Sequence, residues 1–304
     1  DDWLATDARY LEAARALWPE NRILVYRNAS APDIARLLCR CGAMLGFEGR
    51  GVSWSHGQKL KGLLRPGHCL LPADGLVEKL RVIKEPCEIA ALEKSFLLNH
   101  QMFAWLENRL AAGELASRNE KTLAWEIEKF FRDNGAQELA FDTIAATGKN
   151  GARPHAIPGA RIFAANEPVL VDAGCRVDDY CSDQTRTWWH GPEPSADFEK
   201  TLGLVRSAQE AALAMMAPGV PCADVYKAAT QVFIDAGVEK AFTHGLGHGV
   251  GLQTHEAPSL SPFSSQILAE NMVVTVEPGL YYPDWGGVRW ENTVLIEKNG
   301  IRIL

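Results

Sequence analysis

The pattern of apolar positions changes near residue 82. Beyond this point apolar side chains recur three, four or seven residues apart, as on one face of an α-helix; the members of this stripe are Ile89, Leu92, Phe96, Phe103, Leu106 and Leu110. Pro86 suits the first turn of such a helix, and Gly113 ends it. The sequence therefore predicts a long helix here, and we place a domain boundary between residues 81 and 82.

One pattern of elements occurs twice in residues 82–304. Ser117 and Glu120 form a capping box for a second helix, which Gly135 ends. Strand-like segments follow this helix pair at 141–147, 168–174 and 182–189. Two further helix-like segments, 196–216 and 223–237, precede strand-like or extended segments at 243–256, 272–282 and 288–297. Two helices followed by about three strands, repeated once, predict an α+β domain of two similar halves around one sheet.

Residues 1–81 are organised differently. Residues 22–27 have a strand-like composition, and residues 31–45 have a helix-like pattern. We therefore predict a small α/β N-terminal domain. Because the sequence does not begin with Met, we expect this domain to be truncated, and its first ten residues do not resemble a signal peptide.

Composition narrows the classes of partner. The chain has 304 residues, with 31 basic and 38 acidic residues and a net charge of -7. Because no run of Lys and Arg is present, neither nucleic acid nor an anionic membrane is expected as a partner. No apolar stretch approaches the roughly 20 residues that span a bilayer. The seven cysteines lack a Cys-x-x-Cys spacing, which favours a reducing cytoplasm over a disulfide framework.

The segment THGLGHGVGLQTHE, residues 243–256, has histidines among alternating glycines. The glycine spacing does not fit a Rossmann turn, and no Lys-Ser/Thr pair follows as in a P-loop. A zinc-binding helix is also disfavoured, because each glycine costs about 1 kcal/mol of helix stability. We therefore predict an extended or looped segment in which glycine permits close backbone approach. For any one of its histidines, a hydrogen-bonded structural role remains an alternative.

Two pairs of acidic residues have the spacing of hairpin partners. Asp172 and Asp183 lie equally far from a turn predicted at Val177 and Asp178, which would place them about 5 Å apart. Glu277 and Glu291 likewise flank a turn signal centred near residue 284.

Either pair alone could be an acid/base couple or solvated edge residues. Together, four carboxylates and one imidazole make a hard ligand set that two divalent cations would neutralise. His248 is the natural nitrogen ligand, because its flanking glycines leave room for a metal.

Residues 82–304 resemble the pita-bread metallopeptidases, specifically the aminopeptidase P and prolidase branch that cleaves Xaa-Pro bonds. The resemblance rests on several motifs in order: two aspartates eleven apart with Thr-Arg-Thr after the second, His-Gly-x-Gly-His-x-x-Gly, His-Glu-x-Pro, Glu-Pro-Gly and Arg-x-Glu. It implies a pita-bread (creatinase/aminopeptidase-like) C-terminal domain of two ααβββ halves behind a small α/β N-terminal domain.

The resemblance also implies roles for individual residues. The implied metal ligands are Asp172, Asp183, His248, Glu277 and Glu291. They would hold two divalent metal ions, with Mn²⁺ favoured and Co²⁺ or Zn²⁺ as alternatives, and a hydroxide bridging the ions would attack the peptide. The implied catalytic residues are His155, His255 and Glu277, with His255 donating to the oxyanion and Glu277 shuttling a proton; the implied substrate-binding residues are His155, His244 and Arg289.

The expected substrate is a peptide with proline at the second position, and a homodimer is expected. Three features depart from the family pattern: Asn292 replaces a second acid, Trp290 replaces an aliphatic residue, and the N-terminal piece is short. The alternatives are a methionine-aminopeptidase-like activity, a creatinase-like C–N hydrolase without metal, and a non-catalytic binding module. The sequence does not distinguish a dipeptidase from an aminopeptidase.

Overall fold

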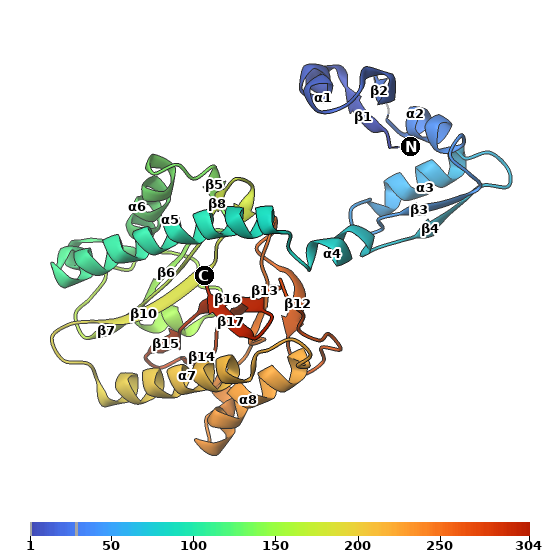
Figure 1. The fold of residues 1–304 in the computed structure, drawn as a ribbon. Helices are drawn as coiled ribbons and strands as arrows, with labels where there is room; N and C mark the ends of the chain where they lie inside the picture. The colour runs from blue at the N-terminus through green and yellow to red at the C-terminus, as the bar shows by residue number, and fades with distance from the viewer. Residues whose placement is uncertain (1, 28–29) are drawn as a thin grey trace. The chain divides into compact units, whose positions relative to one another are not determined.

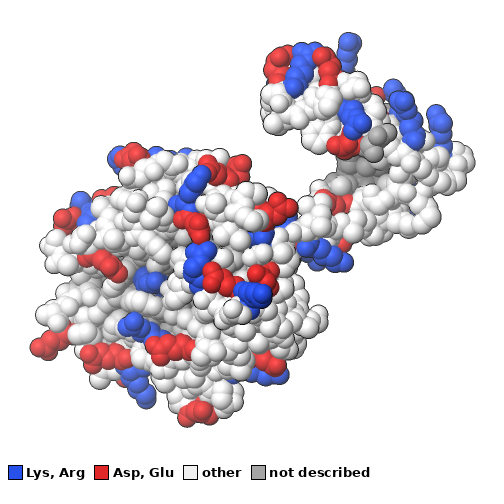
Figure 2. Space-filling model, in the orientation of Figure 1, with Lys and Arg blue, Asp and Glu red and all other residues white. Residues whose placement is uncertain are grey.

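The structure is a computed structural model that describes residues 2–27 and 30–304. The chain divides into two compact units, Asp1–Val77 and Glu78–Leu304 (Figure 1). The domain boundary predicted between residues 81 and 82 stays a prediction. No helix in the described part of the chain is long and apolar enough to cross a membrane. Acidic and basic side chains are interspersed over the visible face of the second unit (Figure 2).

The first unit contains two pairs of parallel strands and short helices. Its elements are β1 (Leu4–Asp7), α1 (Leu11–Leu17), β2 (Ile23–Tyr26), α2 (Ser30–Leu38), β3 (Met44–Phe47), α3 (Trp54–Leu63) and β4 (Cys69–Pro72), and α4 (Leu76–Arg81) includes the division. Strand β1 pairs with β2, and β3 pairs with β4.

The strand predicted at residues 22–27 is confirmed, but the helix predicted over 31–45 ends at Leu38. A tight turn follows this helix, where Cys41 N donates to Leu38 O, and Gly42 has a φ of +152°. Glycine adopts this conformation readily, whereas other residues rarely do, so Gly42 allows the chain to turn after the helix. Strand β3 begins two residues later.

The second unit consists of two halves with helices followed by strands. The first half contains α5 (Pro86–Ala111), α6 (Glu120–Asp133), β5 (Glu138–Leu139), β6 (Ile144–Thr147), β7 (Glu167–Ala173), β8 (Cys175–Val177), β9 (Tyr180–Cys181) and β10 (Gln184–His190). The second contains α7 (Ala196–Met215), α8 (Cys222–Asp235), β11 (Gly247–Gly249), β12 (Glu256–Leu260), β13 (Val273–Val276), β14 (Gly279–Tyr282), β15 (Gly286–Arg289), β16 (Asn292–Glu297) and β17 (Gly300–Ile303).

The strands of this unit lie between two helix pairs, α5 with α6 and α7 with α8 (Figure 1). The larger sheets have the strand orders β10-β7-β6 and β12-β11-β13-β16-β17, and shorter ladders join β14 to β15 and β5, β8 and β9. One apolar core joins α7 and α8 to the second-half strands, and another joins α5 and α6 to the first-half strands. The predicted α+β architecture with two similar halves is confirmed.

In the second unit, the helix ends agree with the sequence except at the start of α6. Helix α5 begins at Pro86, and Gly113, with a φ of +72°, follows its end. The predicted capping box at Ser117 is wrong, because Asn119 caps α6 by accepting a hydrogen bond from Thr122 N (2.9 Å).

The turn of the first acidic hairpin is shifted by one residue from the prediction. Asp178 and Asp179 both have positive φ, as in a type I′ turn, and Asp172 lies opposite Thr185 rather than Asp183. The pairing is therefore shifted by two residues. Because side chains alternate with a period of two, Asp172 and Asp183 still share one face as diagonal neighbours.

The predicted register of the second acidic hairpin is confirmed. Val276 lies opposite Asn292 in one ladder, and Gly279 lies opposite Arg289 in the next. Both ladders have the same register, so Glu277 and Glu291 face each other between them.

Candidate metal centre

The glycine-rich segment forms a central strand. Strand β11 lies between β12 and β13, and a Cβ at Gly247 or Gly249 would overlap the carbonyl oxygen of Thr275 or Ala257 respectively. The prediction of an extended segment with close backbone approach is therefore confirmed. His248, between these glycines, donates from its backbone N to Thr275 Oγ1 (3.0 Å).

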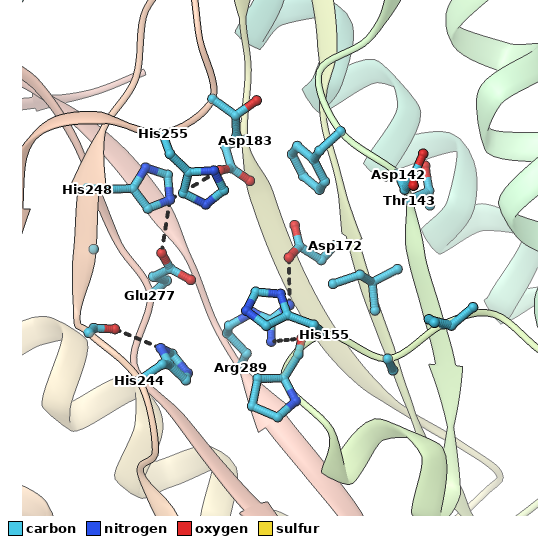
Figure 3. Close-up of a pocket in the computed structure, with 18 of the residues that line it drawn as sticks. Asp142, Thr143, His155, Asp172, Asp183, His244, His248, His255, Glu277 and Arg289 are labelled. Atoms are coloured by element: carbon cyan, nitrogen blue, oxygen red, sulfur yellow. Dashed lines mark hydrogen bonds and ion pairs between the residues drawn. The ribbon is translucent and has the colours of Figure 1, made fainter. Parts of the chain in front are cut away.

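The five residues with predicted ligand roles lie together. Oxygens of Asp172, Asp183 and Glu291 lie within 4.8 Å of one another, and all three side chains are buried. His248 Nε2 is 3.3 Å from Glu277 Oε1 and 3.6 Å from Asp183 Oδ2. In Figure 3 these groups, with Glu291 not drawn, converge from strands that are far apart in the sequence.

The buried carboxylates lack sufficient positive charge around them. Burial, and then repulsion from neighbouring carboxylates, raises the pKa of both Asp183 and Glu291 well above the usual range. Burial also raises the pKa of Asp172, although Arg289 opposes this. Among the described residues, Asp172 Oδ1 and Glu291 Oε1 have no hydrogen-bond partner although both are buried. Unpaired buried carboxylate oxygens are costly, and they are ligands that hard divalent cations prefer.

His248 and Glu277 form the polar contact at the edge of this cluster. Burial raises the pKa of Glu277, but the hydrogen bond and charge of His248 outweigh it and lower the pKa to about 2. For His248, burial lowers the pKa, but Glu277 outweighs it and raises the value to about 9. Glu277 thus favours the protonated form of the His248 imidazole.

Arg289 holds the carboxylates of the cluster in position. It is buried, and it donates from Nη2 to Asp172 Oδ2 (2.6 Å), from Nε to Thr185 Oγ1 (3.0 Å) and from Nη1 to Tyr281 OH (2.8 Å). Thr185 Oγ1 in turn donates to Glu291 Oε2 (2.8 Å). Each of the three guanidinium nitrogens therefore donates to a protein group. Arg289 also lines the pocket.

Tyr281 is a buried residue of this network that the sequence analysis missed. Gly245 O can only accept, so His244 Nδ1 carries the proton and donates to it (2.7 Å). His244 Nε2 therefore accepts from Tyr281 OH (2.8 Å), which itself accepts from Arg289. Strand alternation could have indicated this residue, because Tyr281 lies four positions after Glu277, and alternate positions of a strand share one face.

Asp172, Asp183 and Glu277 line a cavity of about 600 Å³. His155 and His255 are exposed within it, and the His255 ring centroid lies 4.2 Å from that of His248. Burial, and then the charge of His248, lowers the pKa of His255, so that this ring is neutral at pH 7. His155 lies on a segment whose apolar residues Ile157 and Pro158 also line the cavity.

Glu120 anchors the segment that carries His155. This buried carboxylate accepts hydrogen bonds from Thr147 N (2.9 Å), Asn150 Nδ2 (2.8 Å) and Gly159 N (2.8 Å). It thereby holds both ends of the segment, which explains why Glu120 does not serve the helix cap predicted for it.

Trp290 and Asn292, the two positions after Arg289 that depart from the family pattern, contact cationic and amide side chains. The guanidinium groups of Arg186 and Arg206 both lie over the Trp290 ring, 4.5 and 4.9 Å from its centroid. Asn292 Oδ1 accepts from Arg186 Nη2 (3.0 Å), and its Nδ2 donates to Gln209 Oε1 (3.3 Å). Asn292 thus joins a cation on one side to an amide on the other.

Comparisons with known proteins agree with this architecture. The chain is 35% identical over 231 residues to an uncharacterized peptidase of Staphylococcus aureus and 34% identical over 231 residues to a Xaa-Pro dipeptidase of Pyrococcus horikoshii; each match covers 76% of this chain. The chain spans 64% of the length of these curated relatives. The solved Xaa-Pro dipeptidase from Bacillus anthracis superposes with a TM-score of 0.91 at 31% identity, covering 98% of this chain and 82% of that structure.

Family models divide the sequence in two. The creatinase/prolidase N-terminal domain matches residues 1–83, and metallopeptidase family M24 matches residues 90–298. The resemblance inferred from the motifs is confirmed, and the second unit has the pita-bread architecture. Because the second match covers more than half of the sequence, this chain belongs to metallopeptidase family M24.

Proposed function

We propose that this chain is a metal-dependent exopeptidase that hydrolyses Xaa-Pro peptide bonds. The observation that carries the proposal is the buried cluster of Asp172, Asp183 and Glu291 beside His248 and Glu277. All of these except Glu291 line a cavity large enough for a short peptide. The names of a curated relative and of a solved structure, both Xaa-Pro dipeptidases, support the same activity.

The donor set fits two divalent cations. Asp172, Asp183, His248, Glu277 and Glu291 would hold them, and the unpaired oxygens of Asp172 and Glu291 supply acceptors that the protein leaves unsatisfied. When bound, such ions polarise a carbonyl and lower the pKa of water. Mn²⁺ is the ion we propose, with Co²⁺ and Zn²⁺ as alternatives, because carboxylate-rich sites suit harder ions.

The remaining side chains of the pocket bind and orient the peptide. His255 is neutral and exposed in the pocket, so one ring N–H can donate to the carbonyl oxygen as negative charge develops there. Glu277 can hold a proton on its carboxylate and pass it to the leaving nitrogen. We assign the proline side of the peptide to the segment with His155, where Ile157 and Pro158 supply apolar surface for the ring.

His244 and Arg289 complete the proposed substrate-binding wall. Because both nitrogens of His244 are bonded within the protein, this ring contributes its apolar edge and fixes Tyr281 rather than donating to the peptide. Arg289 supports the site by holding Asp172. We also propose a homodimer in a reducing cytoplasm, which light scattering at micromolar concentration would test; a monomer mass would contradict the dimer.

A panel of peptides tests the proposed activity. Metal-free enzyme is reconstituted separately with Mn²⁺, Co²⁺ and Zn²⁺ and then assayed on Leu-Pro, Leu-Pro-Ala, Leu-Ala-Ala and Met-Ala-Ala. We expect the proline peptides to have a kcat/KM about tenfold or more above the alanine peptides, which is about 1.4 kcal/mol in the transition state. Equal rates, or a preference for Met-Ala-Ala, would instead indicate a methionine-aminopeptidase-like enzyme, and binding without hydrolysis would indicate a non-catalytic module.

A further inference from the structure

A bulge precedes the strand β6 that borders the metal centre. Ala140 N donates to Gly174 O (3.0 Å), and Ile144 lies opposite Asp172 in the ladder between β6 and β7. Three residues, 141–143, therefore stand opposite a single residue of the neighbouring strand. Bulges leave extra residues unpaired and turn their side chains, and they are common beside active sites.

Hydrogen bonds from other elements hold both strands at this bulge. Asn99 Nδ2, from α5, donates to Ala173 O (3.0 Å), the residue opposite the bulge. Thr254 Oγ1 donates to Ala140 O (2.9 Å) immediately before it. Because both flanks are fixed, the bulge presents a defined set of side chains to the cavity.

Phe141, Asp142 and Thr143 all line the pocket. Figure 3 shows Asp142 on one side of Asp172 and Asp183, opposite the side that carries His248 and Glu277. Asp142 therefore lies apart from the proposed ligands.

Asp142 is a carboxylate for which the described residues provide no counter-charge. The four acidic residues of the proposed metal centre would be neutralised by two divalent ions, and Arg289 is bonded to Asp172. Asp142 is exposed, and it has no hydrogen bond or ion pair with any residue in 2–27 or 30–304. Among the carboxylates of the described residues that line the pocket, Asp142 is thus the one that is neither a proposed metal ligand nor paired with Arg289, so its charge can face a substrate.

The surroundings of Asp142 match a long side chain with a cationic end. Phe141 and Ile144 line the same wall, and Ile144 is 8% exposed. Lysine and arginine place their methylene stems on apolar surface while the charged group remains in a polar environment. An apolar wall ending in an exposed carboxylate therefore suits a basic side chain better than an aliphatic or acidic one.

We propose that Asp142 is a specificity-determining residue that selects peptides whose first residue is lysine or arginine. This inference rests on the proposed Xaa-Pro peptidase function. The segment with His155 takes the proline side of the peptide, so the bulge wall contacts the residue before the scissile bond. Selection acts through one ion pair between the side chain of that residue and the Asp142 carboxylate.

The test compares Lys-Pro-Ala with norleucine-Pro-Ala, which has the same stem but lacks the ammonium group. The Mn²⁺-loaded wild type should have a kcat/KM about fivefold higher for the lysine peptide, the upper range for an exposed ion pair. Raising the salt concentration to about 0.5 M should reduce this ratio, because added ions screen exposed charges. Hydrolysis of norleucine-Pro-Ala reports the proposed function by itself, and the ratio reports the specificity.

Three variants identify the residue responsible. Asp142→Asn should bring the ratio to about one through a loss of kcat/KM on Lys-Pro-Ala, and Asp142→Lys should favour Glu-Pro-Ala. Asp284→Asn, which removes an exposed charge from the turn between β14 and β15, is the matched control and should keep the wild-type ratio. Equal rates on both peptides in the wild type, or an equal loss on both in Asp142→Asn, would overturn the assignment. Failure to cleave any proline peptide would contradict the proposed function as well.

Discussion

Replacing Gln209 with methionine should weaken the link between the two chain segments that contain Glu277 and Glu291. Gln209 is buried on α7, and its Nε2 donates to Val276 O (2.8 Å) and Trp290 O (3.1 Å). Each of these carbonyls belongs to the residue directly before one of the glutamates. The bridge lies between the last pair of the β13–β16 ladder and the first pair of the β14–β15 ladder.

The expected loss follows from the contacts of this side chain. Methionine is similar in length to glutamine but has no amide, so Gln209→Met removes both donated bonds and the acceptor for Asn292 Nδ2. A hydrogen bond contributes about 0.5–1.5 kcal/mol net, and a buried polar group without a partner costs about 1–3 kcal/mol. We therefore expect the free energy of unfolding of the metal-free protein to fall by about 2–4 kcal/mol. Substitution of a residue that orients metal ligands typically lowers metal affinity by 10–100-fold, so the affinity for Mn²⁺ should fall about tenfold.

Urea unfolding and calorimetric titration with Mn²⁺ measure the two effects. Gln231→Met on α8 is the matched control, because Gln231 is exposed and its Nε2 donates only to Asp235 Oδ1 (2.7 Å) among the described residues. The control should change the free energy of unfolding by no more than about 0.5 kcal/mol. If Gln209→Met unfolds like the wild type and binds Mn²⁺ equally well, the Gln209 bridge has no energetic role and the reasoning is refuted.

Three other predictions follow from the same network. Tyr281→Phe removes the hydroxyl between His244 and Arg289, so it should keep the metal content while lowering kcat about tenfold or more; metal analysis showing loss of ions would contradict this. His255→Ala should also retain the ions while kcat falls about 10²-fold, the usual cost of one oxyanion donor, whereas loss of metal would make His255 a ligand. His248 has a pKa of about 9 without metal and must be neutral as a ligand, so at pH 7 metal binding should release a proton and affinity should rise as pH increases towards 9. Calorimetry in buffers of different ionisation enthalpy measures this release, and heats independent of the buffer would argue against it.

The elements with strong local signals could be predicted from sequence. Helix α5 has a continuous apolar stripe between Pro86 and Gly113, and both ends were located. The second acidic hairpin was placed in register because Pro283 and Gly286 mark its turn. In both cases residues close in sequence determine the structure.

The first acidic hairpin shows why boundaries are harder. Its turn consists of Asp178 and Asp179, with no glycine or proline to distinguish it from its neighbours. The resulting two-residue shift in pairing moved the partner of Asp172 to Thr185 without moving any side chain to the other face. The convergence of the acidic residues could therefore be predicted even though their pairing was wrong.

The supporting residues of the site depend on distant contacts. Glu120 bonds to residues 27 to 39 positions away, and Tyr281 contacts His244, which lies 37 positions earlier in the chain. The bulge that exposes Asp142 results from the relative registers of two ladders, which no local pattern reports. Sequence motifs indicated candidate ligands, whereas the side chains that position them required the folded chain.

The number of Mn²⁺ ions bound per chain tests the metal centre most directly. Dialysed metal-free protein is titrated with Mn²⁺ by calorimetry, and the metal content is measured after gel filtration. We expect two ions per wild-type chain, and fewer than two in Asp183→Asn and Glu291→Gln, because each variant removes a carboxylate from the cluster. A wild-type chain that binds no Mn²⁺, or variants that bind as many ions as the wild type, would contradict the assignment of these side chains as ligands.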